Sequence, residues 1–245
     1  MKEALGYFLA ITLAEFITAI GEPMWGIFGH IIILFAVVLR SALTSRQSHQ
    51  QLLLSLALVP LIRIISLSMP LVNIPQAWWY PIIYTPLLVA ALMVVRVLGL
   101  RAKEVGFVSG WLPVQLIIAL SGFILGVVEY LILKPEAMIV EVTWQGIWLP
   151  TLIFVVTTGF VEEFIFRGVL QRTALEAFGW RGIVYVSLLF GVLHMGFLSW
   201  IDIVFVFVVA LFFGWTVKKT GSLLGVTLAH GITNSVLFLV APSFF

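Results

Sequence analysis

The chain has no cysteine and little charge of either sign. Among its 245 residues, none is cysteine and only 10% are Asp, Glu, Lys or Arg. The missing cysteine excludes disulfide bonds and catalysis by a thiol. The net charge is only +2 and is spread over loops, so no basic surface of the kind that binds nucleic acid is expected.

Long apolar runs, in contrast, fill the sequence. The chain is 62% hydrophobic and its mean hydropathy is +1.18. A helix needs about 20 apolar residues to cross a bilayer, and the runs here are of that length. They do not alternate as the strands of a membrane barrel do. We therefore predict an all-α, polytopic integral membrane helical bundle that forms one transmembrane domain over residues 1–245.

The runs predict about eight or nine transmembrane helices. The first two runs are both short, and the first could also be a signal peptide. Glu15 would be unusual in the apolar part of a signal, so we expect the first helix to be retained. The expected spans are 4–20, 24–38, 51–69, 79–98, 114–133, a span from 147 to the polar residues near 172–176, 182–197, 201–217 and 223–240.

The basic residues predict a cytosolic N-terminus, because cytosolic loops carry an excess of Lys and Arg. With nine spans, the segments on the N-terminal side hold ten basic residues, and the loops on the other side hold only Lys134. The ten are Lys2, Arg40, Arg46, Arg96, Arg101, Lys103, Arg172, Arg181, Lys218 and Lys219. The sequence leaves open whether the membrane is a prokaryotic plasma membrane or a eukaryotic endoplasmic reticulum.

One apolar run carries a cluster of charges. Residues 159–168 read GFVEEFIFRG and hold Glu162, Glu163 and Arg167 within six positions. A charge at membrane depth costs about 3 kcal/mol and usually faces a protein interior or a wet cavity. On an α-helix Glu163 and Arg167 share a face and can pair, whereas Glu162 points about 100° away from Glu163. We therefore expect the two glutamates to have different roles.

Two later spans supply histidines. His194 lies on the span 182–197, and His230 precedes Asn234 by four residues on the span 223–240. Counting about 1.5 Å per residue from the basic ends of the spans brings Glu162, His194 and His230 to one level in the cytosolic half of the membrane. We expect these side chains to surround a cavity that opens to the cytosol.

Other polar residues lie within or near the spans. Glu15 and Arg63 fall at similar depth and are predicted to form a structural pair. His30 is predicted to have a core or interfacial role. Glu129 and Asp202 fall near helix ends, where we expect their side chains to reach water.

These residues resemble the CPBP, or Abi, family of intramembrane proteases, which includes type II CAAX prenyl endopeptidases and bacteriocin-processing or immunity proteins. The family's pattern is EExxxR, then FxxxH, then HxxxN or HxxxD on three helices. The corresponding residues in this chain are Glu162, Glu163 and Arg167, then Phe190 and His194, then His230 and Asn234. The resemblance runs from about residue 149 to the C-terminus, and it puts the catalytic helices within about 147–245.

The resemblance implies proteolysis by an activated water. Glu162 would be the general base, His194 would hold or polarise the water, and His230 with Asn234 would stabilise the oxyanion. Glu163 and Arg167 would orient the site. The substrate would be a membrane-anchored chain, with a C-terminally prenylated CAAX peptide as the best-known example in the family.

The need for a metal stays open at this point. No cofactor is certain, but a carboxylate and two imidazoles suit zinc, and the ligands would then be Glu162, His194 and His230.

Other activities are less consistent with the sequence. A diaspartyl protease needs two aspartates, and the chain has only Asp202. No histidine is followed directly by glutamate, which excludes the HExxH motif. The nearest match to a rhomboid GxSG motif, residues 106–110, is one residue too long. The main alternative is a non-catalytic membrane scaffold or immunity protein on the same fold. A transporter is less favoured, because no inverted repeat is evident.

Overall fold

The computed structural model describes residues 2–139 and 141–245, and within them it is helical without a β-strand. The α-helices are α1 (Lys2–Ile20), α2 (Pro23–Leu43), α3 (Gln47–Leu56), α4 (Leu58–Ser68), α5 (Trp79–Leu98), α6 (Leu112–Leu133), α7 (Trp144–Phe154), α8 (Gln171–Phe178), α9 (Arg181–Val192), α10 (Trp200–Thr220) and α11 (Leu224–Ser235). Short 3₁₀ turns precede α5 (Gln76–Trp78) and follow α9 (Met195–Phe197).

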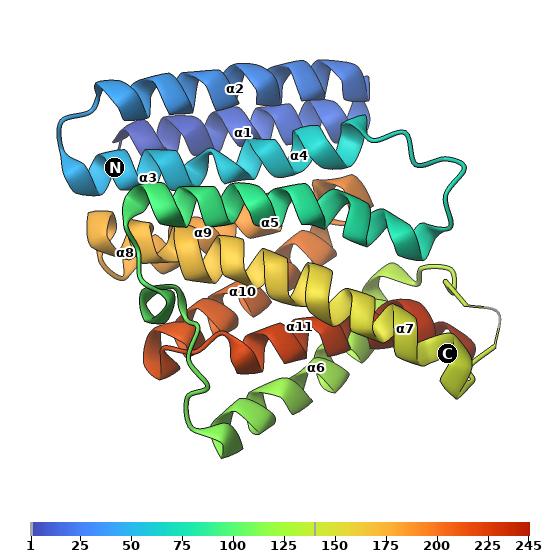
Figure 1. Ribbon diagram of the computed structural model, residues 1–245. Coiled ribbons are helices and arrows are strands. Elements are labelled where there is room, and N and C mark those ends of the chain that lie inside the picture. Colours follow the sequence, from blue (N-terminus) through green and yellow to red (C-terminus); the bar gives the residue numbers. More distant parts are fainter. Residues whose placement is uncertain (1, 140) are drawn as a thin grey trace.

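The helices cross one bundle side by side, with the two termini at opposite ends (Figure 1). Eight helical segments of the described chain are long and apolar enough to span a membrane, which confirms an integral membrane helical bundle. α3 and α4 together form one of these segments, and α7 to α8 form another, Trp144–Phe178. The ninth expected span is the shorter apolar segment Arg181–Phe197. The side of the membrane on which the N-terminus lies stays a prediction.

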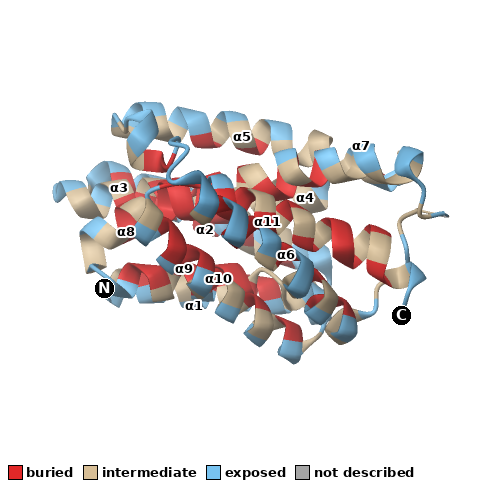
Figure 2. Ribbon diagram, turned by 90° about the horizontal axis from the view of Figure 1, so that it is seen from below, coloured by how far each residue is buried: buried red, intermediate tan, exposed pale blue. Residues whose placement is uncertain are grey.

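Apolar side chains cover the outside of the bundle, as a lipid-facing surface requires. Large residues such as Phe35 and Ile32 are exposed, whereas polar residues such as Glu15 and His30 are completely buried. Figure 2 shows the same division, with buried residues between the helices and exposed ones on their outward faces. The chain therefore keeps its ionisable groups in the protein interior, where other side chains can pair with them.

The predicted pair of Glu15 and Arg63 forms between α1 and α4. Arg63 Nε donates to Glu15 Oε1 at 2.6 Å, and Arg63 Nη2 donates to Glu15 Oε2. His30 Nε2 lies 2.9 Å from Glu15 Oε1, which places His30 in the core, as predicted. The three residues connect α1, α2 and α4 through a buried ionic network.

The expectation that Glu129 and Asp202 reach water is wrong. Asp202 is fully buried and Glu129 is 7% exposed. Both residues lie near the ends of their helices, which suggested that they reach the membrane boundary. Neighbouring helices pack over both side chains, however, and spacing along the sequence does not reveal this packing. Asp202 lies in the first turn of α10, where Ser199 Oγ accepts from the Asp202 backbone N–H at 3.2 Å and caps the helix.

The segment from α7 to α8 is the longest continuous helix of the described chain, at 35 residues. Its middle is wound as π-helix over Val155–Glu162 and again over Phe164–Leu170. A π-helical turn holds one more residue than an α-helical turn and occurs frequently at functional sites. This irregular middle carries all three charges of the EExxxR pattern.

Candidate active site

The π-helical segment packs closely against α11, because both contribute glycine where they meet. A Cβ atom at Gly159 would lie 2.5 Å from the Thr227 carbonyl oxygen, and one at Gly231 would lie 2.5 Å from Val155 Cγ2. Any side chain at either position would force the two helices apart. This close crossing brings the two glutamates of the first helix to the histidine of the second.

Glu163 pairs with Arg167 as the spacing predicts. Glu163 Oε1 lies 3.2 Å from Arg167 Nη1, and both side chains are almost completely buried. The Arg167 guanidinium also lies over the Phe190 ring, 4.4 Å from its centre, as a cation–π contact. Phe190 of the second motif therefore does more than pack, because it helps to hold the arginine of the first motif.

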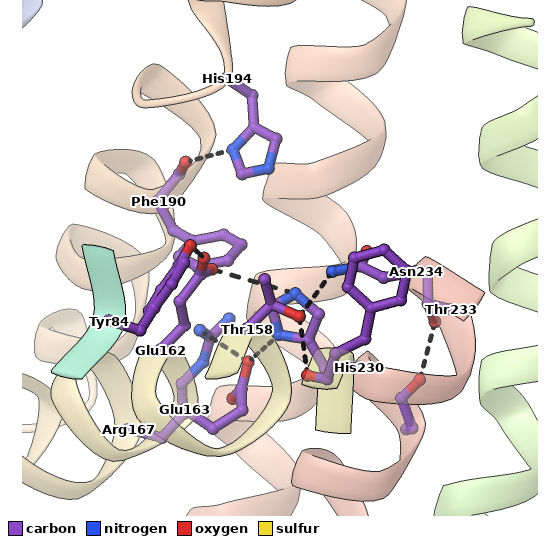
Figure 3. A network of polar contacts seen from close by, with 12 residues as sticks. Tyr84, Thr158, Glu162, Glu163, Arg167, Phe190, His194, His230, Thr233 and Asn234 are labelled. Carbon is purple, nitrogen blue, oxygen red and sulfur yellow. Dashed lines mark hydrogen bonds and ion pairs between the residues drawn. The ribbon is translucent and has the colours of Figure 1, made fainter. Parts of the chain in front are cut away.

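His230 lies between the two glutamates (Figure 3). Its Nδ1 is 2.8 Å from Glu163 Oε1, and its Nε2 is 3.9 Å from Glu162 Oε2. The two carboxylates do point in different directions, but they meet the opposite edges of one imidazole. Glu163 therefore holds His230 in addition to pairing with Arg167 along its own helix.

Tyr84 of α5 donates a hydrogen bond from its hydroxyl to Glu162 Oε1. Sequence analysis missed this residue, since an aromatic near the start of a span usually indicates the membrane interface. The contact leaves Glu162 Oε2 on the side of His230. Glu162 is thus held by a partner from a helix outside the three motifs.

Asn234 follows His230 by one helical turn and reaches back to the π-helical segment. Its Nδ2 donates to Thr158 Oγ1 at 2.8 Å, and Thr158 precedes Glu162 by four residues. Sequence analysis also missed Thr158, because a threonine in an apolar helix commonly hydrogen-bonds to the backbone of its own helix and so does not indicate a partner on another helix. Thr158 does this too, donating to the Phe154 carbonyl at 2.9 Å.

His194 does not lie on a helix as expected. α9 ends at Val192, and His194 occupies the turn before Met195–Phe197. His194 Nδ1 is 3.0 Å from the Phe190 carbonyl oxygen. A carbonyl only accepts, so Nδ1 carries a proton and a neutral ring has Nε2 free to accept. The same turn is held by Arg63, whose Nη2 donates to the Leu193 carbonyl at 3.0 Å.

All six predicted site residues line one cavity of about 310 Å³, together with Tyr84, Arg63 and Glu129. The rest of its wall is mostly aromatic and aliphatic. The structure thus brings the three motifs to one space, while the catalytic role of each residue stays a prediction. Further lining residues include Ser66, Trp79, Tyr80, Phe197, Leu237 and Phe238.

The lining of the cavity comes from α4, α5, α6, α9, α10 and α11 and from the π-helical segment between α7 and α8, helices that cross the bundle side by side (Figure 1). The side of the membrane to which the cavity opens stays a prediction.

The proposed zinc ligands do not form a metal-binding set in this geometry. Within residues 2–139 and 141–245, no group of three His, Asp or Glu side chains is placed to hold a metal ion. His230 and His194 each use Nδ1 for a protein partner, Glu163 and the Phe190 carbonyl, and Nε2 of both rings stays free. No step below is assigned to a metal.

Comparison with known proteins agrees with the motifs. Residues 144–236 match the family model described as type II CAAX prenyl endopeptidase Rce1-like. This stretch runs from the start of α7 into the end of α11 and contains all six predicted site residues. No curated protein and no solved structure matches the chain significantly. The family match thus falls on the part of the chain that forms the candidate site.

Proposed function

We propose that the protein is an intramembrane endopeptidase that hydrolyses a peptide bond of a membrane-associated substrate with a water activated by Glu162. The observation that carries this proposal is the position of Glu162 in the cavity. One of its oxygens is engaged by Tyr84, and the other faces His230 at 3.9 Å. That gap leaves Glu162 Oε2 without a close partner, so it can accept a proton from a water.

The proposed reaction needs only side chains that line the cavity. Glu162 takes a proton from water while the water oxygen bonds to the carbonyl carbon of the scissile peptide. The carbonyl π electrons move onto its oxygen and form an oxyanion. Collapse of this intermediate breaks the C–N bond, and Glu162 returns the proton to the leaving amine. The products are a carboxylic acid and an amine, so atoms and charge balance.

His194, His230 and Asn234 supply the polar contacts that this reaction needs. His194 presents Nε2 to the cavity, where it can accept a hydrogen bond from the water. His230, held by Glu163, and Asn234, held through Thr158, are assigned to the oxyanion. For His230 to donate from Nε2 its ring must carry a proton on both nitrogens, because Nδ1 already donates to Glu163.

The substrate is proposed to be a lipid-anchored or membrane-inserted peptide, because the cavity wall is mostly aromatic and aliphatic. The matched family is named for CAAX prenyl endopeptidases, so a C-terminally prenylated peptide is the first one to test. The partners are then membrane lipid and the anchored substrate.

The test is cleavage by purified protein reconstituted in liposomes. Fluorogenic peptides with and without a prenyl group are compared between wild type, Glu162→Gln and His194→Ala, with the exposed loop variant Glu136→Gln as control. We expect cleavage by wild type and the control and its loss in the two site variants. Full activity of both site variants would overturn the mechanism. If folded wild type cleaves none of the peptides and instead retains a partner subunit, the non-catalytic scaffold is the better function.

A further inference from the structure

Arg63 of α4 lines the cavity together with the candidate site residues, although it lies outside the matched stretch 144–236. Its side chain is 17% exposed, whereas its partner Glu15 and the adjacent His30 are completely buried. A charged side chain at membrane depth is costly and often marks a place where a ligand binds. Arg63 has one side toward its buried partners and another toward the cavity, so its structural pair does not account for the whole side chain.

Arg63 has more hydrogen-bond donors than its protein partners use. A guanidinium carries five N–H groups, one on Nε and two on each Nη atom. Nε and Nη2 donate to Glu15, and Nη2 also donates to the Leu193 carbonyl at 3.0 Å. Among the described residues, no acceptor bonds to Arg63 Nη1, and this atom is not enclosed by protein either. Two N–H groups of a cation are therefore available to a ligand in the cavity.

The available donors of Arg63 suit a carboxylate better than a neutral carbonyl. Hydrogen bonds between arginine and a carboxylate are roughly twice as strong as those between neutral groups. Glu15 does not take up the whole positive charge, because it is shared by two donors. His30 Nε2 lies 2.9 Å from the same Glu15 oxygen to which Arg63 Nε donates. A second carboxylate on the cavity side would thus meet a cation that is only partly compensated.

The acidic residues of the cavity wall do not occupy Arg63. Glu162 accepts a hydrogen bond from Tyr84, and Glu163 pairs along its own helix. Glu129 lines the cavity from α6. Within the described part of the chain, Glu15 is the only carboxylate at ion-pair distance from Arg63. A carboxylate that binds Nη1 must therefore come from a ligand.

Arg63 also lies beside the proposed place of water attack. Its bond to the Leu193 carbonyl joins it to the residue directly before His194. Arg63, His194 and Glu162 all line the same cavity of about 310 Å³. An extended peptide advances only about 3.3 Å per residue. A chain end held at Arg63 would thus leave the bond at Glu162 only a few residues away.

We propose that Arg63 binds the free C-terminal carboxylate of the substrate through Nη1, and that this contact selects chain ends over internal segments. The proposal rests on the proposed peptidase function and assigns a specificity residue to it. The residue comes from α4, so the half of the chain without a family match determines which peptides are accepted.

The first test compares three fluorogenic peptides that share one sequence and one membrane anchor. One has a free C-terminal carboxylate, one a C-terminal amide, and one an amide with aspartate as its last residue. Wild type in liposomes should cleave the carboxylate peptide with a kcat/KM about ten- to a hundredfold above that of the plain amide. Equal kcat/KM for these two peptides would overturn the proposal. Equal kcat/KM for the aspartate amide and the carboxylate peptide would also do so, because Arg63 would then bind any acidic group.

The second test uses Arg63→Lys, which keeps a cation beside Glu15. Lysine has a single ammonium group instead of a planar fork, so it presents no donor in place of Nη1 once it pairs with Glu15. We expect the preference for the carboxylate peptide over the amide to disappear. Arg40→Lys, which changes the exposed arginine beside Glu3, should keep the preference. The preference is a ratio within each variant, so a loss of folded protein cancels, and an unchanged ratio in Arg63→Lys would overturn the proposal.

Binding separates this proposal from the peptidase function. Fluorescence anisotropy measures the Kd of the labelled carboxylate and amide peptides for Glu162→Gln in detergent. We expect the carboxylate peptide to bind about ten- to a hundredfold more tightly. Equal Kd values would overturn the carboxylate site even if wild type cleaves both peptides. Tighter binding of the carboxylate peptide without any cleavage by wild type would refute the peptidase and leave the carboxylate site established.

Discussion

The hydroxyl of Tyr84 donates a hydrogen bond to Glu162, although the two residues lie 78 positions apart. Tyr84 lies outside the matched stretch 144–236, so the N-terminal half of the chain contributes directly to the candidate site. If Glu162 is the base, Tyr84 sets which carboxylate oxygen faces the substrate.

Tyr84→Phe should lower kcat while leaving KM nearly unchanged, because it removes an orienting bond without changing the shape of the cavity. A hydrogen bond to a charged group contributes about 1.5–3 kcal/mol, which corresponds to a rate loss of about ten- to a hundredfold. The measurement is steady-state cleavage in liposomes. Tyr130→Phe, on α6 beside Phe245, is the control. Equal kcat for Tyr84→Phe and wild type would show that the hydrogen bond from Tyr84 to Glu162 does not contribute to catalysis.

The buried network of Glu15, His30 and Arg63 should contribute strongly to stability. Arg63→Met leaves Glu15 charged and buried without its main partner, which costs about 3–5 kcal/mol. The matched control is Arg40→Met, which removes the exposed pair between Arg40 and Glu3 and should have little effect on stability. Thermal unfolding in detergent compares the two variants, and an equal loss in both would contradict the assigned role.

Arg63 should also influence catalysis, since it holds the Leu193 carbonyl next to His194. Arg63→Lys keeps a positive charge near Glu15 but loses the second donor to Leu193. We expect a fall in kcat that is larger than the loss of stability explains. The check is kcat and KM measured well below the unfolding midpoint of each variant. Wild-type kcat in Arg63→Lys would limit Arg63 to a structural role.

The contact between Gly159 and α11 should tolerate no side chain. In Gly159→Ala the new Cβ would lie 2.5 Å from the Thr227 carbonyl, and the backbone there cannot move without separating the helices. We expect a destabilisation of about 1–3 kcal/mol and a marked loss of cleavage as Glu162 moves from His230. Gly6→Ala is the control, since a Cβ there meets nothing within 4 Å. It should stabilise α1 by up to about 1 kcal/mol.

Removal of metal ions should leave cleavage intact, because the described part of the chain gathers no three-ligand set. The experiment is dialysis of reconstituted protein against phenanthroline, followed by assay with and without added zinc. A loss of cleavage that zinc restores would contradict this expectation.

The sequence predicted the helices well and the contacts less well. Apolar runs set the spans, so the predicted 79–98 agrees with α5 at Trp79–Leu98. The pairs Glu163–Arg167 and Glu15–Arg63 followed from spacing and depth. Tyr84 and Thr158 could not be predicted, because nothing local to an aromatic or a threonine indicates which distant carboxylate or amide it meets. The end of α9 at Val192 could not be predicted either, because the apolar run continues to Phe197.

The π-helical winding of Val155–Glu162 also depends on how many residues this segment contains. A π-turn is in effect an α-helix with one inserted residue, so deletion of a single residue there would let the helix relax to ordinary α-winding. The deletion would rotate the helix that follows the deleted residue by about 100° relative to the helix that precedes it. Thr158 and Glu162 would then no longer face Asn234 and Tyr84 together. For this segment, substitutions preserve the register that the site needs, whereas a change in length by one residue abolishes it.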